Sequence, residues 1–573
     1  MTIAVSDQVP RTTHGFDYTR LVLYGFALVL VVLIVLPMSW LVYYAFVDKN
    51  GAFTLKNFAR LFSESSFIEP LITTFILATT TSVICCLVAA PIGWLVARTD
   101  MPLRRTTRLM VTASFVTPPF LGAIAWELLA APNSGLLNQI YRSLTGAEMG
   151  EHIFDIYSFP GLIFVIACYT FPYVFVLVAN ALDRMPSELE DASAILGAGA
   201  WTTARRVTVP LAMPALLAGA LVAFLQAMTL FGSPAILAIP AQFHTMTTKI
   251  WSLFQYPPKP ELAAAASLPL LILTVILLRA EHMILGRRGY AVLGGKNSEP
   301  RIIRLGHFRY VALGLCFLVL LCPVFLPYGA LFNAAFSRIA TQFVSTSNFT
   351  FHNIYFVFFE LSATKLAFYN TFVLGIATAT LGTLLAIVIS YLTTREAVTG
   401  HRALGFLATA PVAIPGIVLG VGLFLSYTRP PLLLYGTLWI LLLAFLTLSL
   451  PAAYQQMQSA FRSIHPELED ASRILGATRL RALREITAPL LRTSVIATWC
   501  FVFVGTIREL SAAIMLFTSE TKVISVLIFD LNESGDLAAI SVLGIIMLII
   551  TFANVALANS LRGSNARRNV AIG

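Results

Sequence analysis

The sequence predicts an all-α polytopic membrane protein with about 12 transmembrane helices in two homologous six-helix halves. Hydrophobic residues make up 58% of the 573 residues and charged residues only 12%, whereas about a quarter of a soluble protein is charged. Residues 188–198 (ELEDASAILGA) recur as 467–477 (ELEDASRILGA), at a constant offset of 279 and with a single difference, Ala194 against Arg473. Such self-similarity indicates an internal duplication.

The predicted spans are apolar runs of about 20 residues, the length that a helix needs to cross the hydrocarbon layer. In the first half they cover about 21–47, 71–97, 109–131, 159–183, 211–231 and 262–284. In the second half they cover about 309–331, 369–393, 403–426, 434–459, 489–508 and 536–560. The predicted domains are therefore a first half at 1–284, a cytoplasmic linker at 285–308 that is rich in Gly and basic residues, and a second half at 309–573.

Lys and Arg residues orient these spans, because the cytoplasmic loops of membrane proteins carry an excess of both. If the N-terminus is cytoplasmic, the inside segments hold 27 of the 38 Lys and Arg residues. This topology puts both termini and both repeated segments in the cytoplasm. Membrane topology then explains the net charge of +10, and because the basic residues are scattered through short links, we expect no nucleic-acid partner.

The two halves differ in length ahead of the repeated segment. Thr74-Phe75 resembles Thr371-Phe372 at an offset of 297 rather than 279, so the first half has 18 extra residues. We expect them in the outside link at 132–158. That link either helps to dock an external partner or is an ordinary loop insertion.

Each repeated segment is predicted to form a short amphipathic helix followed by a glycine bend. Glu188 and Glu190 lie near the positive end of the helix dipole, and Gly197 and Gly476 permit a backbone turn that other residues resist. Apolar residues recur at helical spacing, in the first copy Leu189, Ala192, Ile195 and Leu196. A helix lying on lipid headgroups is one interpretation, but anionic lipid would repel its carboxylates. A docking helix for a cytoplasmic partner, one in each half, fits better.

These segments resemble the EAA loop of ATP-binding cassette (ABC) importer permeases, which runs Glu-Ala-Ala, three residues, Gly, nine residues, Ile-x-Leu-Pro. The first loop, at about 184–210, has Asp191-Ala192-Ser193, Gly197 and Val207-Thr208-Val209-Pro210 at this spacing. The second, at about 462–489, has Asp470-Ala471-Ser472, Gly476 and Ile486-Thr487-Ala488-Pro489. Both loops depart from the family pattern, with Asp in place of Glu and Ser in place of the second Ala.

The departures leave open whether the aspartates or the preceding Glu190 and Glu469 make the charged contact to an ATPase. The resemblance implies the following ATPase-coupling residues: Glu190, Asp191, Ala192, Ser193, Gly197, Ala198, Glu469, Asp470, Ala471, Ser472, Gly476 and Ala477. In the family these loops form coupling helices that seat in grooves of the nucleotide-binding subunits.

The resemblance further implies the type I ABC importer transmembrane fold, in a multi-pass protein of the bacterial inner (plasma) membrane. The implied partners are two copies of a cytoplasmic ABC ATPase, which bind ATP and Mg, a periplasmic or extracellular solute-binding protein, and membrane lipid. The chain itself would bind no cofactor or metal and would be no enzyme. Its nearest approach to a phosphate-binding loop, GYAVLGGK at 289–296, has Gly where the lysine belongs, and Asn297 follows Lys296 in place of Ser or Thr.

Polar residues inside spans are costly and are therefore candidates for a translocation pathway. Glu127 lies in the third predicted span, and Arg508 and Glu509 end the eleventh. The alternative for the last two is an ion pair at a helix end near the headgroups. Prolines at 118, 119, 411 and 415, with Gly416, are expected to break their helices, and the freed backbone groups could line a passage.

The cargo is less well defined than the coupling. The segments GRRGYAVLGGK, after the sixth span, and RELSAAIMLF, near the eleventh, resemble the ferric iron permease branch of type I importers. Ferric ion prefers hard oxygen ligands, and the spans have few carboxylates, so selectivity would rest on the binding protein. Related permeases serve thiamine, phosphonates, sugar phosphates or polyamines. An ion-coupled secondary transporter is a further alternative, but it would need membrane-embedded carboxylates and no cytoplasmic docking helices.

Overall fold

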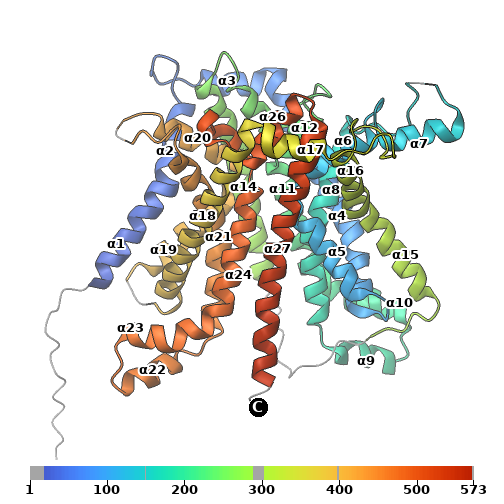
Figure 1. Ribbon diagram of the computed structural model, residues 1–573. Helices are drawn as coiled ribbons and strands as arrows, with labels where there is room; N and C mark the ends of the chain where they lie inside the picture. Colours follow the sequence, from blue (N-terminus) through green and yellow to red (C-terminus); the bar gives the residue numbers. More distant parts are fainter. Residues whose placement is uncertain (1–17, 149, 288–301, 397–398, 431, 571–573) are drawn as a thin grey trace, which may run out of the picture.

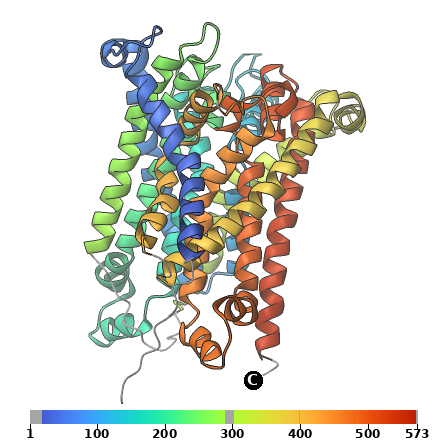
Figure 2. The ribbon, with the colours of Figure 1, turned by 90° about the vertical axis from the view of Figure 1, so that its left-hand side faces the viewer.

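A computed structural model describes residues 18–148, 150–287, 302–396, 399–430 and 432–570, and the regular elements in these ranges are helices. Ten of the described helices are long and apolar enough to cross a membrane, or up to twelve if two bent pairs each form one span. The helices run roughly side by side in one bundle, and short helices lie at both of its ends (Figures 1 and 2). The prediction of a polytopic all-helical membrane protein is confirmed.

The helices of the two halves follow the same order. In the first half, the long elements are α1 (Tyr18–Leu30) with α2 (Leu36–Ala45), α4 (Ser65–Arg98), α5 (Arg104–Val116) with α6 (Pro119–Ala130), α8 (Phe159–Asp183), α11 (Val209–Thr229) and α14 (Pro260–Arg287). In the second half, they are α15 (Phe308–Leu320) with α16 (Leu326–Ala335), α18 (Ser362–Thr394), α19 (His401–Thr409) with α20 (Gly416–Tyr427), α21 (Leu438–Arg462), α24 (Ala488–Ile507) and α27 (Leu537–Val570).

Short helices mark the two ends of the bundle. One end carries α3 (Lys56–Ser63), α7 (Leu136–Thr145), α12 (Gly232–Leu237), α13 (Met246–Ser252), α17 (His352–Tyr355), α25 (Ala513–Leu516) and α26 (Ile524–Glu533). The opposite end carries α9 (Ser187–Ile195), α10 (Ala200–Thr203), α22 (Glu467–Ile474) and α23 (Arg479–Ala482), together with the lower end of α27 (Figure 1). The predicted linker lies mostly at 288–301, outside the described residues.

The third and ninth spans, predicted at 109–131 and 403–426 with proline breaks inside them, are bent. The axes of α5 and α6 differ by 98°, and the corresponding bend between α19 and α20 is 110°. Proline explains both breaks, because it has no N–H to donate to the preceding turn and its ring clashes with that turn. The predicted breaks at Pro118-Pro119 and Pro415 are therefore confirmed.

The halves interlock through the first span of each. α2 packs against α20 of the second half, and α16 packs against α6 of the first. The Tyr427 hydroxyl donates to the carbonyl of Val32, at 2.8 Å, within a π-helical turn at Val31–Val35. In the other direction, the Tyr328 hydroxyl lies 2.5 Å from Thr117 Oγ1. Residues of both halves accordingly share one buried apolar core.

Close packing inside the first half depends on Gly122 of α6. A Cβ atom at this position would overlap the ring of Tyr169 on α8, whereas a Cβ at Gly25 would meet nothing within 4 Å. We expect Gly122→Ala to destabilise the protein by about 1–3 kcal/mol, the usual cost of overpacking. Thermal unfolding in nanodiscs checks this, with Gly25→Ala as the control that does not lower the melting temperature, because alanine is the better helix former where no clash opposes it. Equal melting temperatures for the two variants would contradict the packing described.

Candidate functional site

The two repeated segments form equivalent units on one end of the bundle. α9 and α22 project from it beside the lower ends of the spans (Figure 1). Each helix ends at a glycine with positive φ, +81° at Gly197 and +93° at Gly476, a conformation that strongly favours glycine. The chain then continues through α10 or α23 and a π-helical turn into the next span. The predicted helix and glycine bend are present in both copies.

These two glycines give a direct test of the bend. Proline cannot adopt a positive φ, so we expect Gly197→Pro combined with Gly476→Pro to displace α9 and α22 without changing the spans. Limited proteolysis should cut both loops faster in the double variant, while the far-ultraviolet circular dichroism of the spans is retained. Gly199→Pro is a less restrictive control, because Gly199 does not have positive φ and its Cβ would meet nothing within 4 Å. Unchanged cleavage in the double variant would contradict the geometry.

A buried carboxylate anchors α9 to two spans. The side chain of Glu190 is 3% exposed, and its Oε1 lies 3.0 Å from Arg98 Nη2 at the end of α4. The same oxygen accepts a hydrogen bond of 2.7 Å from Thr208 Oγ1, in the π-helical turn before α11. Arg98 is itself fully buried. A buried ion pair of this kind holds its elements together, because neither charge can be left alone in a low dielectric.

The second half repeats this anchor. Glu469 Oε1 accepts hydrogen bonds from Arg395 Nη2 and Nε, at 2.9 and 3.1 Å, and from Thr487 Oγ1, at 2.9 Å. Arg395 follows Arg98 at the offset of 297, and Thr487 follows Thr208 at the offset of 279. The sequence interpretation missed both arginines and the role of both threonines. The repeated offsets were the signal that could have found them.

The anchors separate the glutamates from the aspartates that follow them. Glu190 and Glu469 point inward and are buried, whereas Asp191 and Asp470 lie on the exposed side of their helices. Arg473 Nη1 lies 3.4 Å from Asp470 Oδ1. Of the two carboxylate pairs that the sequence left as alternatives, the aspartates are therefore the accessible pair.

The outer face of each short helix is apolar and uncovered. Leu196 is 86% exposed and Leu475 is 89% exposed. Exposed with them are Leu189, Ala192, Ile195, Leu468, Ala471 and Ile474. The small residues behind this face are half-buried, namely Ser193, Ala198, Ser472 and Ala477, and Ser193 Oγ lies 2.9 Å from Thr203 Oγ1. Adjacent exposed apolar side chains on a polar end of the protein are typical of an interaction surface.

A large cavity lies between the halves. Its volume is about 1280 Å³, and its lining comes from α5, α8, α11 and α14 of the first half and from α21, α24 and α27 of the second. On the side of α9 and α22 the lining reaches Ser459 and Ser494, near the ends of α21 and α24. On the other side it ends at the helix breaks, where Pro119, Pro415 and Gly416 contribute. The broken helices thus border this cavity, and their role in a passage stays a prediction.

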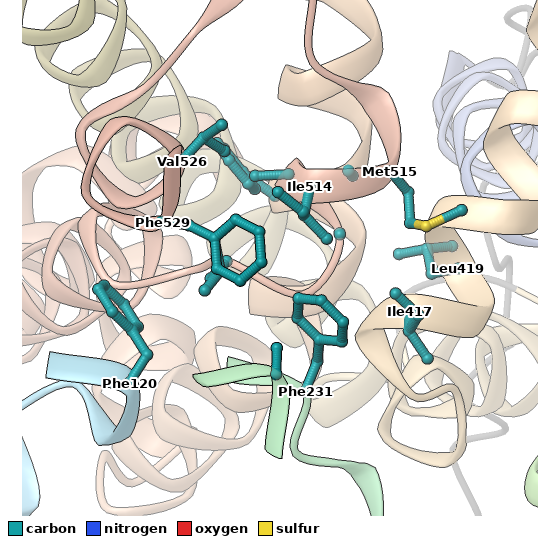
Figure 3. Packing of buried hydrophobic residues seen from close by; sticks show 14 of the residues in the cluster. Phe120, Phe231, Ile417, Leu419, Ile514, Met515, Val526 and Phe529 are labelled. Atoms are coloured by element: carbon teal, nitrogen blue, oxygen red, sulfur yellow. The ribbon is translucent and has the colours of Figure 1, made fainter. Parts of the chain in front are cut away.

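Buried apolar residues close the far end of this cavity. Phe231 is fully buried, and its ring centroid lies 6.1 Å from that of Phe529 and 6.0 Å from that of Trp251. Figure 3 shows this cluster, here called the apolar plug, with side chains from α6, α20, α25 and α26 around Phe231. Its labelled members are Phe120, Phe231, Ile417, Leu419, Ile514, Met515, Val526 and Phe529. The cavity is thus closed on the side away from α9 and α22.

The three predicted pathway residues occupy two different places. Arg508 and Glu509 follow α24 and line the cavity. Arg508 Nη1 donates to the carbonyl of Phe115, at 2.9 Å. In a continuous helix this carbonyl would accept from the N–H of residue 119, but Pro119 has no N–H. Glu127 does not belong to the lining that the described residues form. Its carboxylate instead accepts a hydrogen bond of 2.8 Å from Tyr157.

Two interlocked helical halves around a central cavity, each with an anchored helix exposed at the same end, define the membrane component of a transport system. The chain belongs to the family described as binding-protein-dependent transport system inner membrane component, whose model matches residues 89–288 and 382–569. One match falls in each half. The members of this family are transport subunits and not enzymes.

Curated relatives are similar to most of the chain. The ferric transport system permease protein FbpB of Actinobacillus pleuropneumoniae is 25% identical over 444 residues, which cover 76% of this chain and 63% of the relative. The putative ferric transport system permease protein FbpB 1 of Haemophilus influenzae is 24% identical over 413 residues, 71% of this chain and 64% of the relative. The chain thus spans less than two thirds of the length of these relatives.

A further relative is similar over a shorter stretch. The putative 2-aminoethylphosphonate transport system permease protein PhnV of Salmonella paratyphi A is 29% identical over 141 residues, which cover 25% of this chain and 53% of the relative.

Proposed function

We propose that this chain is the permease subunit of an ATP-driven ABC importer, with α9 and α22 as the coupling helices of two ATPases. The observation that carries the proposal is the pair of exposed apolar helices, each tied to two spans by a buried Arg–Glu–Thr anchor. Because each anchor joins the helix to the ends of neighbouring spans, a displacement of α9 or α22 is transmitted to the cavity wall. ATP and Mg bind to the ATPases, and their closure moves the two coupling helices together.

The side of the membrane follows from the distribution of Lys and Arg. The excess of basic residues supports an orientation in the bacterial inner (plasma) membrane with α9, α22 and both termini on the cytoplasmic side. The cavity then faces the cytoplasm, and the apolar plug closes it toward a solute-binding protein on the outer face. In alternating access, ATP-driven approach of α9 and α22 closes the cytoplasmic side and parts the plug.

Ferric iron is the cargo that we propose. The support is that two permeases similar to most of the chain are named as ferric transport proteins. Phosphonate is the second candidate, supported by the shorter similarity, and thiamine, sugar phosphate and polyamine are the remaining alternatives. An ion-coupled secondary transporter is disfavoured, because among the described lining residues only Glu509 has a carboxylate that could couple to an ion.

Reconstitution tests this proposal. The full chain in proteoliposomes, combined with an ABC ATPase and a solute-binding protein from the same organism, should accumulate cargo only when ATP is enclosed with the ATPase. Identification of the ligand that copurifies with the binding protein assigns the cargo. Uptake that persists without the ATPase, or that follows an imposed ion gradient, would contradict an ABC importer.

A further inference from the structure

The charge of the cavity wall is unusual for a passage that carries a metal cation. Among the described residues of the lining, Arg508 and Glu509 are the two with charged side chains. The other polar groups are neutral amides and hydroxyls, which include Gln226, Thr229 and Gln456. No group of three or more His, Cys, Asp or Glu side chains that could hold a metal ion occurs in the described part of the chain.

The carboxylate of Glu509 is already engaged by the backbone. Its Oε1 accepts a hydrogen bond of 3.0 Å from the N–H of Ala512, just ahead of α25. Ser525 Oγ donates to the backbone carbonyl of the same residue, at 2.7 Å. Glu509 therefore holds the turn between α24 and α25, and among the described residues it forms no ion pair with Arg508 within 4 Å.

Within the described residues, the guanidinium of Arg508 uses only part of its hydrogen-bonding capacity. Nη1 donates to Phe115 and the group lies over the Phe115 ring, 5.7 Å from its centroid. Within the described residues its other N–H groups have no protein acceptor, and the side chain borders the cavity. A planar guanidinium with free donors suits carboxylate, phosphate or phosphonate oxygens, which it binds in a bidentate manner. The first half has Thr229 at the equivalent position, at the offset of 279, so this charge has no counterpart there.

We propose that Arg508 binds the cargo directly, through an anionic oxygen group, as the cargo passes the cavity. The inference rests on the import function proposed above. A bare ferric ion would be repelled by Arg508 and would find a single carboxylate, whereas hard cations need several oxygen ligands. The anionic oxygens belong either to an organic phosphonate, phosphate or carboxylate or to the ligands of a ferric chelate. A cavity of about 1280 Å³ is large enough for either, since small-molecule sites usually measure about 300–1,000 Å³.

Two substitutions separate the charge of Arg508 from its structural contact. Arg508→Lys keeps the charge, and Arg508→Gln keeps an N–H donor for Phe115 but removes the charge. The full chain in nanodiscs, without an ATPase, is titrated calorimetrically with methylphosphonate, iron-free citrate, ferric citrate and spermidine. We expect Arg508→Gln to weaken binding of the anionic probes at least about tenfold, the loss expected for one charged hydrogen bond. Arg508→Lys should lose less, and spermidine should not bind.

The probes also distinguish the two sources of the anion. Binding of methylphosphonate and iron-free citrate supports an organic anion as cargo, and binding of ferric citrate alone supports a ferric chelate. The proposal is overturned if no anionic probe binds, if Arg508→Gln binds anions as the unmodified chain does, or if spermidine binds more tightly than the anions. Because this assay contains no ATPase, failure of ATP-dependent uptake would contradict the import function and leave the binding result standing.

Discussion

Replacing Glu190 by Ala is expected to destabilise the first half by about 3–5 kcal/mol, the cost of leaving one partner of a buried ion pair uncompensated. Arg98 is fully buried and Glu190 is its countercharge, at 3.0 Å. The substitution also removes the acceptor of Thr208, so α9 loses its attachment to both spans. Thermal unfolding in nanodiscs measures the loss, and ATP-dependent uptake should disappear with it.

Two further variants show whether burial of the ion pair causes the loss of stability in Glu190→Ala. Glu469→Ala should cost less, because the Arg395 side chain remains 11% exposed and can be partly hydrated, whereas that of Arg98 is 1% exposed. Glu188→Ala is the matched control on the same helix, since Glu188 is exposed. We expect it to change stability by less than about 0.5 kcal/mol. An equal cost for all three substitutions would show that the anchors are not buried ion pairs.

Placing a charge on the apolar ends of both short helices is expected to abolish ATPase binding while leaving the fold intact. Leu196 and Leu475 are almost fully exposed, so Leu196→Asp with Leu475→Asp has no effect on the core. In a complex, however, each aspartate would be buried against an apolar groove without a partner, at a cost of several kcal/mol. Coprecipitation of the ATPase with the purified chain measures the loss.

The control for this pair uses the opposite end of the bundle. Leu144 of α7 is 80% exposed, so Leu144→Asp makes the same chemical change away from α9 and α22. The ATPase should bind this variant as it binds the unmodified chain. Loss of binding in Leu144→Asp, or retention in the double variant, would show that the ATPase docks elsewhere.

Local sequence patterns were sufficient to predict the spans and the two repeated short helices, α9 and α22. The span predicted at 159–183 coincides with α8 (Phe159–Asp183), because its apolar run has clear limits. Proline also predicted where α5 and α19 end, since the loss of one backbone N–H acts locally. The size of the two bends could not be predicted, because it depends on how α6 and α20 pack against the opposite half.

Contacts between distant parts of the chain could not be predicted in this way. Arg98 and Glu190 are 92 positions apart, and no helical or strand period joins them. The apolar plug is harder still, because Phe231 and Phe529 lie in or beside short helices whose composition does not differ from that of a span. For the anchors the duplication contained the missing information. The arginines recur at the offset of 297 and the glutamates and threonines at the offset of 279, and polar residues that recur in both halves indicate a contact common to both.

The number of ATPases that bind one chain tests the central claim most directly. Native mass spectrometry of the full chain in nanodiscs with excess ATPase should show two ATPases per chain, one on α9 and one on α22. Leu196→Asp or Leu475→Asp alone should reduce this number to one, and the two together should reduce it to none. Two ATPases on the double variant, or a single ATPase on the unmodified chain, would contradict the assignment of the two repeated helices as the sites of coupling.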